Sequence, residues 1–203
     1  MTRKDLLKNI AITGYNVGFG AKRHFATLDI IDKVPGTIGV LSTAIGVFAL
    51  VFDILSAKWL SALFIVLGHI GTCISIFDHQ KEMYDQAGKE LTQKFHDLRR
   101  LYYSANALEE DDAEGLAALE ANWKEIEKKC GSIGISKQIL LSGWYAHLKF
   151  FGESHIDWVD EELHFKFWKD KIPASLYAWV FLVVACGLGF LIWVSISALE
   201  VSA

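Results

Sequence analysis

Three long stretches of this sequence contain no aspartate, glutamate, lysine or arginine. They run from Val34 to Phe52, from Trp59 to Phe77 and from Ile172 to Leu199. A helix of 19 residues, the length of the two shorter stretches, reaches about 28 Å, close to the roughly 30 Å hydrocarbon core of a bilayer. Although 22% of the chain is charged, the charges lie outside these stretches. The sequence therefore predicts an all-α integral membrane protein with three spans.

The first two apolar stretches are separated only by the segment from Asp53 to Lys58. Such a short connection cannot cross a bilayer, so residues 34–77 are expected to form a tight antiparallel transmembrane hairpin. Residues 172–203 are expected to form a third, C-terminal transmembrane helix. The first stretch is too long, and too far from the N-terminus, for a cleavable signal peptide.

The basic residues predict the orientation in the membrane. Six precede Val34, one lies in the hairpin loop, thirteen lie between Asp78 and Lys171, and none follows Lys171. Because basic residues near the ends of spans stay on the cytoplasmic side, the N-terminus and the central region are expected in the cytoplasm and the C-terminus outside.

Residues 1–33 are expected to form an amphipathic N-terminal arm. Apolar residues recur at helical spacing, but Gly14, Gly18 and Gly20 interrupt the pattern, and glycine costs about 1 kcal/mol in a helix interior. We expect one or two helices that lie on the membrane surface or against the core of the protein. A simple basic topology anchor is an equally good interpretation.

Residues 78–131 show the spacing of a coiled coil. Nothing after Phe77 breaks a helix, so the second span is expected to continue into this region. Two apolar stripes with heptad-like spacing follow, and they predict a cytoplasmic helical hairpin that folds back on itself. Asp112 is expected to cap the second helix and Gly131 to end it. The first stripe consists of Tyr84, Leu91, Phe95, Leu98, Tyr102 and Ala105.

Residues 132–171 are expected to form two amphipathic helices rich in aromatic side chains. Ser136 is a candidate cap for a helix that ends at Phe151, and Asp157 for one that ends near Lys169. The density of tryptophan and phenylalanine suggests contact with the bilayer interface or with the underside of the bundle.

Small and polar residues in the hairpin are the candidate site. Small residues recur along one face of the first span, and a carboxylate follows them; the second span carries its own small residues and an ionisable His69 near its midplane. Small faces let helices pack closely within one molecule or between subunits. His69 either lines a pore or forms a hydrogen bond with a neighbouring helix. The candidates for pore lining or helix packing are Gly39, Thr43, Gly46, Asp53, Ser61, His69 and Thr72, with Gly68, Gly71 and Ser75 as further small residues.

Other functional classes are not supported by the sequence. Serine-hydrolase, P-loop, kinase and zinc-protease signatures are absent, so no enzyme, catalytic residue or cofactor is predicted. Asp160 and His164 share a helical face, but the matching ligands of a di-iron bundle are missing, and no metal site is predicted. A net charge of −4, without a basic and aromatic patch, argues against a nucleic-acid partner.

Several segments resemble the SLATT family, the SMODS- and SLOG-associating two-transmembrane effectors of bacterial conflict systems. The resemblance rests on Tyr15 to Phe25 (YNVGFGAKRHF), Asp32 to Gly36 (DKVPG), the tight hairpin and the helix that begins at Asp78 (DHQK). Relative to the two spans of that family, this chain has an additional C-terminal apolar segment.

The resemblance implies a homo-oligomeric effector that perforates the bacterial inner membrane when a partner sensor or a nucleotide-signalling enzyme is triggered by infection. The main hypothesis from the sequence is therefore a pore-forming or membrane-disrupting effector of an antiviral system. The alternative is a non-conducting membrane scaffold that recruits a cytoplasmic partner through its helical hairpin.

Overall fold

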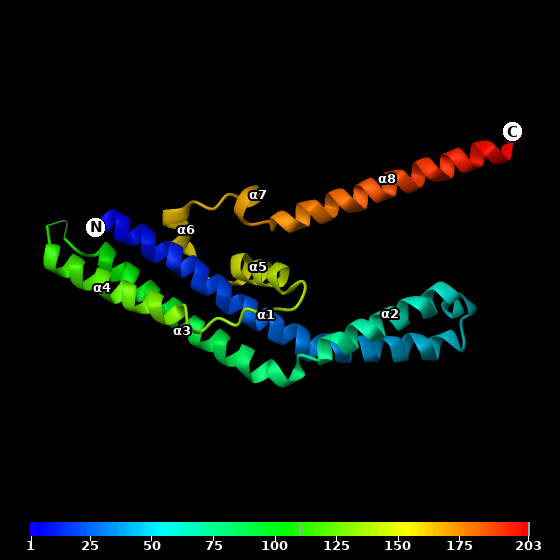
Figure 1. Cartoon of the computed structure of the whole chain (residues 1–203), viewed down its shortest axis with the longest axis horizontal. Coiled ribbons are helices and arrows are strands. Elements are labelled where there is room, and N and C mark those ends of the chain that lie inside the picture. Colours follow the sequence, from blue (N-terminus) through cyan, green and yellow to red (C-terminus); the bar gives the residue numbers. More distant parts are fainter. Residues whose placement is uncertain (110, 203) are drawn as a thin grey trace. The chain divides into compact units, whose positions relative to one another are not determined.

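The computed structural model describes the backbone of residues 1–109 and 111–202, and their side chains except those of residues 55, 56 and 190–202. All regular structure in this part of the chain is helical. The chain divides into two units, Met1–His164 and Phe165–Ala203. In the first unit, a bundle of helices continues into an apolar helical hairpin (Figure 1).

One long helix, α1 (Arg3–Ala49), forms the axis of the first unit. A capping box starts it, in which the Thr2 side chain accepts a hydrogen bond from the Asp5 amide and the Asp5 side chain accepts one from the Thr2 amide. The helix runs through the arm glycines and through Pro35. The arm and the first span are thus one helix. The arm packs against the bundle, which agrees with the expectation that it lies against the core of the protein and not on the membrane surface.

The glycines do not interrupt α1 because other side chains pack on them. A Cβ atom at Gly14 would overlap the indole of Trp158, and one at Gly18 would lie 2.8 Å from Phe95. These glycines are places of close approach between α1 and its neighbours. Packing of the bundle offsets the helix-forming cost that the sequence suggested.

The hairpin consists of the C-terminal half of α1, a short 3-10 turn η1 (Asp53–Ser56) and α2 (Lys58–Ser75). The sequence predicted that the second span continues as one helix into the next region. In the structure, α2 ends before that region begins. A turn and the 3-10 segment η2 (Asp78–Gln80) separate α2 from α3 (Lys81–Asn106). His79 contributes to this break, since its Nδ1 atom lies 2.9 Å from the Ile76 carbonyl oxygen.

Helices α1 and α3 run antiparallel, and both ends of α3 are joined to α1. At one end, Arg3 donates from Nε to the Ala105 carbonyl at 3.1 Å and from Nη2 to Asn106, so it satisfies free carbonyls at the C-terminus of α3. At the other end, Lys81 pairs with Asp32 at 3.1 Å. The predicted heptad stripe of α3 is buried, but most of its contacts are with α1.

Helix α4 (Ala113–Cys130) folds back along α3 and also contacts α1. Asp112 caps it as expected, since its side chain accepts a hydrogen bond from the Gly115 amide at 2.8 Å. Trp123 of α4 donates from its indole nitrogen to the Thr13 hydroxyl at 3.0 Å. The stripe of α4 therefore meets α1 as well as α3.

Helix α5 (Ser142–Glu153) begins six residues after the predicted cap Ser136. The residues before it are held in a loop by α1 and α3. Gln138 interacts with His24 and with the Thr27 hydroxyl of α1, and Tyr84 of α3 donates to the Lys137 carbonyl. Leu141, with φ of 70°, leads into the helix.

Helix α6 (Asp157–Leu163) is shorter than predicted, because His164 takes a left-handed conformation with φ of 50° and ends it. Its Trp158 is 1% exposed and lies 5.4 Å from the Phe95 ring and 5.3 Å from the Tyr102 ring, between ring centroids. The structure thus places part of the predicted aromatic cluster in the core of the bundle.

The second unit contains α7 (Phe167–Asp170) and α8 (Ala174–Ser202). Tyr177 of α8 donates a hydrogen bond to the Trp168 carbonyl at 2.7 Å. The predicted third span falls on α8, and its side chains beyond Gly189 lie outside the described residues. Within the described side chains, the apolar stretch Ala174–Gly189 is shorter than a full span.

Candidate functional site in the helical hairpin

An open groove runs along the hairpin between α1 and α2. Its volume is about 550 Å³. Small or hydroxyl-bearing side chains form most of its surface, with a few larger apolar side chains beside them. The groove is lined by Pro35, Ile38, Gly39, Ser42 and Thr43 of α1 and by Phe64, Gly68, Gly71, Thr72 and Ser75 of α2.

The small residues determine how the groove is formed. Gly71 is buried, and a Cβ atom there would lie 3.9 Å from the Cα atom of Pro35, so α2 lies against the backbone of α1 at this point. No side chain lies within 4 Å of where a Cβ atom would stand on Gly39 or Gly68. These two glycines therefore leave backbone open to whatever lies in the groove.

Three of the hydroxyl groups of the groove donate hydrogen bonds within their own helices. Thr43 donates to the Gly39 carbonyl at 2.9 Å, Thr72 to the Gly68 carbonyl at 3.0 Å and Ser75 to the Gly71 carbonyl at 3.0 Å. A hydroxyl that bonds four residues back can lie in an apolar environment without a lost hydrogen bond. The groove is therefore compatible with a bilayer even when empty.

The structure brings some of the predicted site residues together and separates others. Gly39, Thr43 and Thr72 line the groove. Gly46, Ser61 and His69 are exposed but lie outside its lining, and Asp53 is at the loop end of the hairpin. The sequence did not single out Phe64 or Ile38, which have no feature that distinguishes them from lipid-facing residues.

His69 is exposed on α2, and its Nε2 atom lies 3.7 Å from the Cys73 sulfur. It contacts its own helix and does not bridge to α1. Most of the neighbouring large side chains of α2 are exposed and apolar, such as Ile65 and Val66. An ionisable side chain on such a surface is costly against lipid alone.

Two stretches are long and apolar enough to cross a membrane by length and composition, Arg3–Ala49 and Lys58–Asn106. Only 6% of the most apolar 18-residue window in each is buried inside the protein. The core of a soluble protein would bury most of such a surface. The apolar surface of the hairpin is therefore available to lipid or to other chains.

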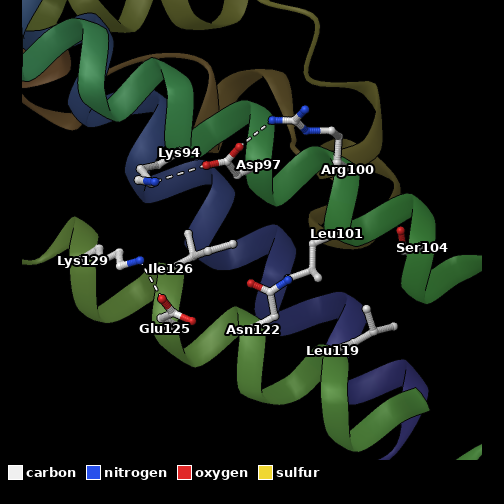
Figure 2. A pocket seen from close by; sticks show the side chains of 10 residues that line it. All are labelled: Lys94, Asp97, Arg100, Leu101, Ser104, Leu119, Asn122, Glu125, Ile126 and Lys129. Atoms are coloured by element: carbon white, nitrogen blue, oxygen red, sulfur yellow. Dashed lines mark hydrogen bonds and ion pairs between the residues drawn. The ribbon is translucent and has the colours of Figure 1, made fainter.

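A second concave surface lies between α3 and α4, with a volume of about 370 Å³. Its charges compensate one another (Figure 2). Asp97 lies 3.2 Å from Lys94 and 2.6 Å from Arg100, and Lys129 lies 2.6 Å from Glu125. Paired, largely exposed charges of this kind are typical of a solvated helix surface.

The acidic and histidine residues near α6 do not form a metal site in the described structure. Among the side chains that the structure describes, no three histidine, cysteine or carboxylate groups gather as metal ligands would. Tyr102 instead contacts two of these carboxylates, Glu161 at 3.1 Å and Glu162 at 3.2 Å. Burial, together with these carboxylates, raises the pKa of Tyr102 well above its ordinary value.

A helical bundle joined by one continuous helix to a short apolar hairpin defines a class, that of helical domains with a two-helix membrane hairpin. The chain matches one such domain, "SMODS and SLOG-associating 2TM effector domain 6", over residues 1–180. It therefore belongs to the SLATT family. The match covers α1 to α7 and the start of α8, which extends the resemblance well beyond the first half of the chain. No curated protein and no solved structure matches it.

Proposed function

We propose that this protein is a pore-forming or membrane-disrupting effector of a bacterial conflict system, and that its hairpins associate in the inner membrane to act. The groove with its open glycines is the observation that carries the proposal. Helices in lipid gain little from apolar contact alone, so close backbone approach at small residues drives much of their association. A helix of a second copy would find such a surface along Gly39 and Gly68.

The polar residues of the hairpin give the assembly a path for ions or water. Ser61 and His69 of α2 are exposed on the single chain. In an oligomer, these side chains would face a shared interior, where their polar groups are hydrated. Asp53 would lie at the outer end of this path, next to the hairpin loop.

The fold supports the proposed topology. The N-terminal half of α1 and helices α3 to α6 all lie at the same end of the hairpin (Figure 1). A chain that crosses twice returns to the side where it began, and the basic residues of this side support a cytoplasmic location. Helix α8 would then cross once more and leave the C-terminus outside.

Activation would come from a partner sensor or a nucleotide-signalling component. The family description names an effector domain that associates with SMODS and SLOG, and we propose that these supply the trigger. The bundle offers the surface for this control, because α1 is continuous from the bundle into the hairpin. No catalytic step is required of this chain, so we propose a non-enzymatic action.

Membrane potential in bacterial cells tests the proposal. Induction of the protein together with its trigger is expected to depolarise cells, because an open assembly conducts ions. Gly39→Leu with Gly68→Leu fills the groove and is expected to abolish depolarisation. Gly187→Leu, at an exposed glycine of α8, is the matched control and should behave as wild type. Normal potential and growth with every trigger tried would contradict the proposal.

A second candidate function is a non-conducting scaffold that captures a cytoplasmic partner. The charged groove between α3 and α4 (Figure 2) favours it, since this surface is open and none of its lining residues belongs to the hairpin. Gly39→Leu with Gly46→Leu separates the two functions. A pore should lose its toxicity in this variant, whereas a scaffold should still capture its partner.

A further inference from the structure

A pocket of about 250 Å³ lies in the helical bundle, away from the hairpin. It is formed where α1, α3 and the end of α5 meet. Its lining combines basic side chains with aromatic rings. The basic side chains are Lys22 and Arg99, with the imidazoles of His96 and His155 beside them, and the rings are Phe25, Phe95 and Phe150.

The charge of this pocket is uncompensated. No carboxylate is among its lining residues, and Lys22 and Arg99 make no ion pair within the described part of the chain. The groove between α3 and α4 is the opposite case, because Asp97 there pairs with both Lys94 and Arg100 (Figure 2). Unpaired cations above a low-dielectric surface concentrate a positive potential and attract anions.

The floor of the pocket is apolar and rigid. Phe150 is 1% exposed and Phe95 is 9% exposed. Gly18 lies against both rings, since a Cβ atom there would be 2.8 Å from Phe95 and 2.9 Å from Phe150. These two rings are almost closed off, so the aromatic face open to a planar or apolar group of a ligand is that of Phe25, which is only partly buried.

One polar group at the pocket lacks a partner. The Ser154 hydroxyl is buried, lines the pocket and makes no hydrogen bond with any described residue. A buried polar group normally has a partner, because leaving it unpaired costs about 1–3 kcal/mol. A ligand with acceptor oxygens would supply that partner.

We propose that this pocket binds a small ligand that carries a phosphate group and an apolar ring. Lys22 and Arg99 would hold the phosphate, because ammonium and guanidinium groups form charge-assisted hydrogen bonds with its oxygens. The ring would lie on the phenylalanine floor. The volume is below the usual range of ligand pockets, which favours a ligand no larger than a mononucleotide or a similar phosphate ester.

The position of the pocket favours a soluble ligand over a lipid headgroup. Lys22 precedes Pro35 on the same helix by about 20 Å at the helical rise, and the apolar span begins only at Val34. A lipid phosphate would have to leave the membrane surface by about this distance to reach the pocket, whereas a soluble ligand would not. The inference does not depend on pore formation, since binding is measurable in a protein that never conducts.

Calorimetric titration of the full-length protein in phosphatidylcholine nanodiscs tests the proposal, with adenosine monophosphate and inorganic phosphate as probes. We expect both to bind, and the nucleotide more tightly, because its ring covers the apolar floor. Lys22→Gln with Arg99→Gln is expected to lower the nucleotide affinity at least tenfold. Arg23→Gln, which removes the same charge from an exposed neighbour on α1, should keep wild-type affinity.

Nanodiscs that contain phosphatidate distinguish the two sources of phosphate. Competition with the nucleotide that disappears in the double variant would support the phosphate site and assign its source to the bilayer. The proposal is overturned if neither probe binds the wild-type protein at millimolar concentration. It is also overturned if the double variant, with wild-type helicity by circular dichroism, binds the nucleotide as well as wild type does, or if Arg23→Gln loses as much affinity.

Discussion

Single glycines of α1 act through the side chains that pack on them. Gly14→Ala is expected to lower the free energy of unfolding by about 1–3 kcal/mol, because the new methyl group overlaps the buried Trp158 ring and forces repacking. Gly20→Ala is the matched control, since its methyl group would lie 3.6 Å from Leu91 in ordinary contact. It should gain up to about 1 kcal/mol from helix propensity. Chemical unfolding in mild detergent, followed by circular dichroism, measures both. Equal effects of the two substitutions would contradict the packing role of Gly14.

His24 makes the stability of the bundle depend on pH. Burial, with a smaller effect of the Arg23 charge, lowers the pKa of His24 below its ordinary value of 6.5. As the pH falls below about 6.5, the unfolded chain binds a proton that the folded protein resists, so the stability should decrease. Unfolding midpoints between pH 7.5 and pH 5 should fall more steeply for wild type than for His24→Asn. Parallel pH profiles would show that His24 is not held neutral.

At the scale of elements, one side chain holds the loop before α5 to the bundle. Gln138 meets both His24 and Thr27 of α1, and it also donates to the Ile135 carbonyl at 2.8 Å. Gln138→Ala is expected to cost about 1–3 kcal/mol locally, because it leaves partly buried polar groups unpaired. Hydrogen exchange of residues 135–141 should accelerate, while α4 keeps its protection.

Gln86→Ala is the control for this loop, since Gln86 bonds only to Glu90 on the exposed face of α3. It should leave exchange in the loop unchanged. If Gln138→Ala also leaves exchange in residues 135–141 at the wild-type rate, the loop is held by other contacts, such as the hydrogen bond from Tyr84 to Lys137.

The sequence predicted which residues of α3 are buried but not what buries them. Periodicity marks an apolar face, and Leu91 and Leu98 are buried as expected. Periodicity does not identify the helix that covers this face. The sequence predicted the next helix along the chain, α4, as the partner. The contacts of Arg3 and Asp32 on α1 fix the partner, because they hold the two ends of α3 against α1.

The boundaries of the shorter helices depended on tertiary contacts and could not be read from local signals. Ser136 is a good cap by composition, yet the following residues are held away from a helix by Gln138 and by Tyr84. His164 ends α6 in a left-handed conformation that a histidine adopts only rarely. Asp112 was predicted correctly because its cap is local to its own helix.

At the scale of the whole molecule, the hairpin groove could be predicted from the sequence, whereas the pocket at Lys22 and Arg99 could not. The groove residues Gly39 and Thr43 recur at helical spacing within one span, so the stripe could be recognised. The phosphate pocket brings together Lys22, Arg99 and His155 from three separate parts of the chain. Single cations far apart in a sequence form no motif, and only the packing of α1, α3 and α5 unites them.

The continuous helix α1 links these surfaces, since it carries Lys22 in the bundle and Gly39 in the hairpin. A change in how the bundle packs on α1 would therefore be transmitted directly to the groove. This arrangement is consistent with a cytoplasmic control region and a membrane-active hairpin in one protein.

Ion flux from liposomes reconstituted with the purified protein tests the central claim, self-association of the hairpin into a membrane-permeabilising assembly, most directly. The account predicts a leak that rises more steeply than linearly with the protein-to-lipid ratio, because several copies form each path. Gly39→Leu with Gly68→Leu should remove the leak, and Gly187→Leu should preserve it. Liposomes that stay sealed at every ratio, or that leak equally with the filled groove, would contradict the account.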